Sequence, residues 1–187
     1  MSKSKFALVL FAILMVPCIC LAGEGPHWTF VEVGYIDFDP DSGLSDDGSY
    51  GEGSLGIFGN FHLVAEYDAV GDYTLWSAGG GWHGLLGEKG DLFAEVLWND
   101  VDFDSSTSNF SDDGYEVSAG IRWNLLKWLE LKGAVNQLDL DQGGNDTSFE
   151  VEAMVSVLKG RLGFGTNYES GDVDTVKVFG RFSFGRK

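Results

Sequence analysis

Aspartates spaced by two residues are the first feature of this sequence that could carry chemistry. On a β-strand this spacing puts both carboxylates on one face, and carboxylate oxygens are ligands that calcium and magnesium prefer. The pattern occurs four times, at Asp37 and Asp39, Asp102 and Asp104, Asp139 and Asp141, and Asp172 and Asp174. The first three pairs are the candidate metal residues. We expect no tightly held cofactor, only loosely bound calcium or magnesium; the alternative is a solvated collar of negative charge.

The three histidines, His27, His62 and His83, argue against hydrolytic chemistry. A surface hydrolase built on a membrane barrel needs its catalytic acids and histidines at the outer rim, where its substrates are. With the strands predicted below, all three histidines lie toward the opposite end. We therefore expect no enzymatic activity, with no catalytic and no cofactor-binding residue, and a surface enzyme is the least favoured class.

The first 22 residues are predicted to be a secretory signal peptide that is removed. Lys3 and Lys5 precede an apolar run from Phe6 to Val16, and the segment closes with small residues at Ala22. Both cysteines lie inside it, so disulfides play no part in the mature chain, residues 23–187. The chain carries 29 acidic and 12 basic side chains, a net charge of −17. This charge argues against a nucleic-acid partner, because phosphates would be repelled.

The mature chain alternates apolar and polar residues, as β-strands with one apolar face do. The clearest run places Tyr115, Val117 and Ala119 on one parity against Glu116 and Ser118 on the other. Ten such segments are predicted, at residues 28–39, 49–59, 61–70, 74–86, 91–104, 114–125, 128–140, 147–158, 161–170 and 175–184. An even number of strands of about 9 to 11 residues is typical of an outer-membrane barrel. The predicted fold is an all-β, transmembrane, antiparallel up-and-down barrel of ten strands, with eight possible; a soluble barrel is the alternative.

The connections between these segments favour the membrane barrel. Connections after odd segments are acidic or polar, and we expect them to be long. Connections after even segments are short and carry cations such as Lys127 and Lys159. Aromatic residues near segment ends, including Trp28, Trp76 and Trp128, fit the interfaces of a bilayer. The cationic end and both termini are expected in the periplasm, and the acidic loops outside the cell, where the partners are the outer membrane and its lipopolysaccharide.

Charged residues lie on the parity opposite the apolar series, which in a membrane barrel places them in the lumen. The lumen residues expected to matter most are Glu116, Arg122, Glu130, Lys132, Glu150 and Arg181. The alternation predicts eight acidic and five basic side chains in the lumen, with Arg161 among the basic ones. The surplus of acid predicts either a sealed structural barrel or, as the alternative, a narrow cation-selective channel.

Several segments resemble a known family. The closing strand, residues 176–184, resembles the C-terminal signal that the barrel-assembly machinery recognises in outer-membrane proteins. Residues 31–35, 59–63, 78–82 and 113–117 look like the small porin-like outer-membrane barrels of proteobacteria, and within them like the group once named for activating a plant immune receptor. The resemblance implies a cell outer-membrane location, assembly by that machinery, and a non-enzymatic, structural or surface role. It gives no solute and no oligomeric state.

Overall fold

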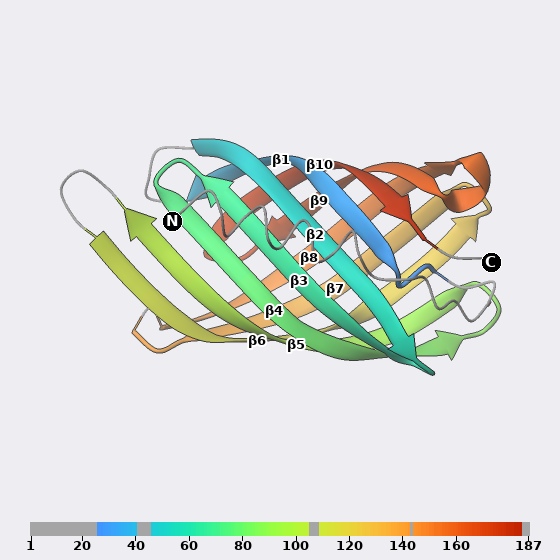
Figure 1. The fold of residues 1–187 in the computed structure, drawn as a ribbon, viewed down its shortest axis with the longest axis horizontal. Helices are drawn as coiled ribbons and strands as arrows, with labels where there is room; N and C mark the ends of the chain where they lie inside the picture. The colour runs from blue at the N-terminus through green and yellow to red at the C-terminus, as the bar shows by residue number, and fades with distance from the viewer. Residues whose placement is uncertain (1–25, 41–45, 105–108, 143, 185–187) are drawn as a thin grey trace.

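The chain forms one closed antiparallel barrel. The structure is a computed structural model that describes residues 26–40, 46–104, 109–142 and 144–184; the predicted signal peptide lies outside them. The ten strands are β1 (Phe30–Pro40), β2 (Asp46–Phe58), β3 (Phe61–Val70), β4 (Tyr73–Leu86), β5 (Gly90–Asp104), β6 (Asn109–Leu126), β7 (Leu129–Leu140), β8 (Gly144–Val157), β9 (Leu162–Ser170) and β10 (Val173–Ser183), with a 3₁₀ turn, η1 (Leu158–Gly160), between β8 and β9. Each strand pairs with its neighbours in sequence, and β1 pairs with β10 to close the barrel (Figure 1). The predicted fold and strand number are confirmed.

The two faces of the wall are inverted relative to a soluble barrel. On β1, Val33 is 57% exposed on the outside, whereas Glu32 is 2% exposed inside. The same alternation continues on β8, where Val151 is exposed and Glu152 buried. Apolar side chains outside and charges inside are the arrangement that lipid requires. The soluble alternative is therefore excluded. None of the described residues forms a helix long and apolar enough to cross a bilayer.

The barrel has two distinct ends. The terminal end holds the start of β1, the end of β10 and the four connections that follow even strands; the loop end holds the connections that follow odd strands. The expected difference in loop length is wrong in part, because Gly71-Asp72 forms a two-residue turn at the loop end, as short as Gly59-Asn60 at the terminal end. Strand pairing extends into segments that were predicted to be loops: β6 already begins at Asn109.

Acidic residues at the loop end brace neighbouring turns. The carboxylate of Asp112 on β6 accepts hydrogen bonds from the backbone N–H of Gln142, at 3.1 and 3.2 Å. Asp146 on β8 accepts in the same way from Asp172 N, at 3.3 Å. The predicted acidic loops are thus partly a set of short hairpins held by inward-facing carboxylates.

Two glycines that each follow an Asp-Asp pair, Gly48 and Gly114, allow close packing between strands. Neither is among the described residues with positive φ. A Cβ at Gly48 would lie 1.9 Å from Ala69 O, and one at Gly114 would lie 2.1 Å from Asp139 O. Only glycine permits this close approach between strands.

Candidate functional site: the lumen

Trp28, which precedes β1, lies inside the barrel at the terminal end. Its side chain is 8% exposed and reaches across the lumen to strands that are not neighbours of β1. The indole Nε1 donates to Asp91 Oδ2 on β5 at 2.7 Å. Ser54 on β2 donates to the Trp28 carbonyl at 2.9 Å. The prediction that Trp28 belongs to the aromatic belt at the bilayer surface is wrong.

Aromatic and cationic groups enclose this indole. The ring centroids of His62 and His83 lie 4.4 and 4.6 Å from that of Trp28, and the His83 ring is stacked on it. The guanidinium of Arg122 on β6 lies 4.7 Å from the centroid of the Trp28 ring. It also donates to the carbonyl of His27 at 3.3 Å. We call Trp28, His62, His83, Asp91 and Arg122 the terminal plug.

A charged layer lies directly above the terminal plug. Arg181 on β10, only 3% exposed, bonds Glu32 on β1 and contacts Glu152 on β8 at 3.0 Å. Its Nη1 lies 3.6 Å from Glu130 Oε1, and Glu130 is in turn the partner of Arg122, whose Nε donates at 3.0 Å. Because a guanidinium presents five donors in a planar fork, two arginines tie together three carboxylates across the lumen.

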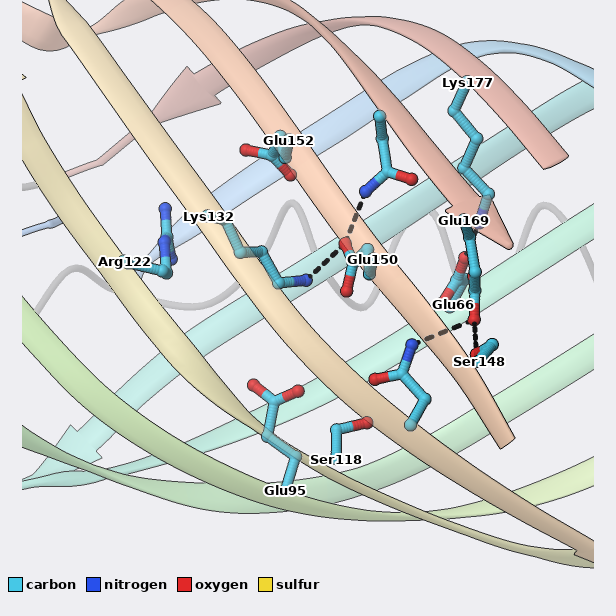
Figure 2. Close-up of polar contacts among 12 residues, drawn as sticks. Glu66, Glu95, Ser118, Arg122, Lys132, Ser148, Glu150, Glu152, Glu169 and Lys177 are labelled. Atoms are coloured by element: carbon cyan, nitrogen blue, oxygen red, sulfur yellow. Dashed lines mark hydrogen bonds and ion pairs between the residues drawn. The ribbon is translucent and has the colours of Figure 1, made fainter. Parts of the chain in front are cut away.

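Lysines replace arginines toward the loop end. Lys132 donates to Glu150 at 2.8 Å, as Figure 2 shows. Lys177 bonds Glu66 and lies 3.2 Å from Asp68, so one ammonium group serves two carboxylates on β3.

A cavity of about 240 Å³ occupies this half of the lumen. Its lining contains ten carboxylates but two ammonium groups, those of Lys132 and Lys177. Toward the loop end the lining becomes apolar and aromatic, with Phe38 and Tyr73 stacked at a centroid distance of 5.6 Å. Glu32 and Glu152 of the charged layer line the cavity and no residue of the terminal plug does, so the cavity ends at the charged layer.

Four cavity carboxylates have no basic partner within 4 Å among the described residues: Glu52, Glu116, Asp146 and Glu169. Glu116 accepts a hydrogen bond from Ser118 at 2.9 Å. Glu169 accepts from Asn136 at 2.9 Å and from Ser148 (Figure 2). Neutral donors orient these carboxylates without cancelling their charge.

The structure places all six expected lumen residues inside the barrel, but it changes the list of charges around them. Arg161, counted as a lumen base, is exposed at the turn after η1. Asp68 and Glu169 line the cavity and were missed, although each continues the parity of an inward residue two positions earlier, Glu66 and Asn167. The alternation alone could have found both.

The Asp-x-Asp pairs lie at the loop end, on the outside. Asp37, Asp102, Asp104, Asp139 and Asp141 are exposed. The backbone of Asp39 pairs with that of Asp174 on β10, which brings two of the four pairs side by side. In the part of the chain that the structure describes, no group of three or more His, Cys, Asp or Glu side chains is arranged to hold a metal ion. The cation collar stays a prediction.

The histidines lie at the terminal end. His62, 1% exposed, shares a hydrogen bond with Glu95 at 2.7 Å, and both rings of the pair His62 and His83 pack on Trp28. Their polar atoms are enclosed by the terminal plug and far from the loop end.

Known proteins resemble this chain in fold and not in sequence. No protein-family model and no curated protein matches the sequence. The chain is similar to the solved structure of the KdgM porin, with a TM-score of 0.50 and 11% identity over 82% of this chain and 99% of that one. It is also similar to the N-terminal β-barrel domain of Pseudomonas aeruginosa OprF, with a TM-score of 0.46 and 12% identity over 84% and 100% of the two chains. The fold is that of a porin-like outer-membrane barrel.

Proposed function

We propose that this protein is a non-enzymatic outer-membrane barrel whose lumen is sealed at the terminal end, so that its role is structural or at the cell surface. The observation that carries the proposal is the terminal plug, in which Trp28 crosses the lumen beneath the layer bridged by Arg122 and Arg181. A passage for solutes would need a continuous water-filled path. Ten strands lie close to the size at which side chains fill a barrel.

The location follows from three features taken together: the predicted signal peptide, the apolar outer face, and the cationic turns at the terminal end. In this proposal the terminal end faces the periplasm and the acidic loop end faces lipopolysaccharide outside the cell. The closing strand engages the barrel-assembly machinery during insertion. Membership of the group once named for activating a plant immune receptor rests on short sequence resemblances and belongs to the proposal.

One observation favours a second candidate, a narrow cation-selective channel. The cavity holds four carboxylates without a basic partner within 4 Å among the described residues, and a negative lumen favours cations over anions. This function would require the terminal plug to move.

Planar-bilayer recording separates the two candidates. The sealed barrel gives a silent bilayer after insertion has been verified by the mobility difference between unheated and boiled protein. Cation-selective steps that weaken in Glu116→Gln would establish the channel instead, and anion-selective steps would contradict both candidates.

Orientation has its own test, because both cysteines lie within the predicted signal peptide. Exposed Asp141 at the loop end and exposed Lys127 at the terminal end are matched sites. Asp141→Cys should react with a membrane-impermeant maleimide on intact cells, and Lys127→Cys should react only after the outer membrane is opened. The reverse pattern would overturn the proposed orientation.

A further inference from the structure

The cavity in the loop-end half of the lumen combines two kinds of lining. Its lining carries Glu52, Glu116, Asp146 and Glu169 without basic partners within 4 Å among the described residues, together with apolar and aromatic side chains such as Phe38, Tyr73 and Leu138. Ligand sites in proteins are typically mostly apolar with a few oriented polar groups. Carboxylates without basic partners beside apolar side chains suit a small molecule with one cationic head and an apolar body.

Two of these carboxylates, Glu116 and Glu169, are oriented by neutral donors and still have free acceptor capacity. Glu169 is fixed by Asn136 and Ser148, and Glu116 by Ser118. An ionised carboxylate offers about four acceptor sites, so each retains room for a further donor. An ammonium group brings three donors and a full positive charge.

A buried atom supplies an independent indication. Asp68 also lines the cavity and is 5% exposed, and its Oδ1 has no hydrogen-bond partner among the described residues. Lys177 contacts the other oxygen, Oδ2. A buried carboxylate oxygen without a donor costs free energy, and a cationic ligand would remove that cost. Asp68, Glu116 and Glu169 line the same cavity, and Glu116 and Glu169 are bonded by Ser118 and Asn136, which are paired on neighbouring strands.

Size and geometry select among cations. The cavity volume of about 240 Å³ corresponds to roughly eight water molecules and lies below the usual range for drug-sized ligands. The described carboxylates do not form a group that could hold a metal ion. The stacked rings of Phe38 and Tyr73 in the lining favour a ligand with a flat apolar body.

We propose that this cavity is a binding site for a small organic cation, a primary amine with a short apolar or aromatic body, whose ammonium group binds among Asp68, Glu116 and Glu169 and whose body packs against Phe38 and Tyr73. The inference rests on the proposed function, because sealing by the terminal plug makes the cavity a pocket rather than a passage. The site takes ligand from the loop end.

Calorimetric titration of the full barrel in zwitterionic micelles tests the site, with benzylamine as the probe and empty micelles as the blank. Benzylamine should bind saturably with one site per barrel, and neutral benzyl alcohol and anionic benzoate should bind at least tenfold more weakly. The variant Glu116→Gln with Glu169→Gln should weaken benzylamine binding at least tenfold. Asp102→Asn, which removes one exposed charge outside the lumen, should leave it unchanged.

Each contrary result has a definite meaning. Equal binding of benzyl alcohol would show an apolar pocket without charge recognition, and competitive displacement by millimolar calcium chloride would show an inorganic cation site; either overturns the proposal. Absence of benzylamine binding to heat-modifiable, folded barrel also overturns it. Bilayer recording is unaffected by these outcomes, so failure of the binding site and failure of the sealed-barrel function are distinguishable.

Discussion

The two halves of the lumen solve the same problem, buried charge, in different ways. In the terminal half, Arg122 and Arg181 bridge Glu32, Glu130 and Glu152, and Trp28 packs against Arg122. In the loop-end half, lysines with compact charges replace the arginines, and a cavity opens beside carboxylates that have no base within 4 Å among the described residues. Planar guanidinium groups can cross-link several carboxylates in a dry space, whereas unpaired carboxylates need room for water or ligand. Sealing and acidity are therefore separate properties of this lumen.

The largest effect on the free energy of unfolding is expected from removing a single buried cation, compared between the two halves. Arg181→Met leaves Glu32 and Glu152 without their base in the buried layer, and breaking such a pair costs about 3–5 kcal/mol. Lys177→Met should cost less than half of that, because Glu66 and Asp68 face the cavity. Urea unfolding in lipid vesicles measures both free energies. Equal losses would mean that the two halves are equally dry.

The second prediction concerns the seal. Trp28→Ala should lower the free energy of unfolding by about 3 kcal/mol, because a buried aromatic ring is lost. Trp28→Phe keeps a ring against His62 and His83 but loses the hydrogen bond to Asp91, so its loss should be about 1–2 kcal/mol. If Trp28→Ala were as stable as the native chain, the terminal plug would not be a structural element.

The third prediction tests the bracing of the loop end. Asp112→Ala removes the acceptor of the Gln142 N–H and should cost about 1–2 kcal/mol. Neighbouring Asp113 has an exposed side chain, so Asp113→Ala should change stability by no more than about 0.5 kcal/mol. The same unfolding assay compares them, and similar values for the pair would remove the proposed role of Asp112.

The smallest effect is expected outside the lumen, at the Asp-x-Asp collar. Changing Asp37, Asp39, Asp102 and Asp104 to Asn should reduce stabilisation by calcium in lipopolysaccharide-containing membranes by less than about 1 kcal/mol, because exposed charges are well solvated. Stability with chelator present throughout should not change. If calcium does not change the stability of the native barrel, the aspartates form only a solvated collar of negative charge.

Alternation along the chain was sufficient to predict the wall of the barrel, because a period of two assigns every side chain to one face once strands are placed. It correctly placed residues such as Glu150 on the lumen side, and it contained the information for Asp68 and Glu169. It could not predict partners across the lumen, such as Lys177 on β10 with Glu66 on β3, since these depend on how strands are staggered around the barrel.

Trp28 marks a different limit of the sequence pattern. Aromatic residues at strand ends are typical of the bilayer interface, and no local pattern distinguishes one that turns inward before β1. Its position follows from Asp91, His83 and Arg122, which are more than 50 residues away in the chain and meet only when the barrel closes.

The most direct test of the central claim, that the lumen is an acidic cavity above a sealed end, uses two matched serines. Both are buried, at 5% exposed for Ser118 and 6% for Ser54, but Ser118 lines the cavity, whereas Ser54 does not line it and donates to the Trp28 carbonyl. Reaction rates of Ser118→Cys and Ser54→Cys are measured in purified barrel with small cationic and anionic methanethiosulfonate reagents. The account predicts that Ser118→Cys reacts at least a hundredfold faster than Ser54→Cys and prefers the cationic reagent. Equal rates at the two sites, or a preference for the anionic reagent at Ser118→Cys, would contradict it.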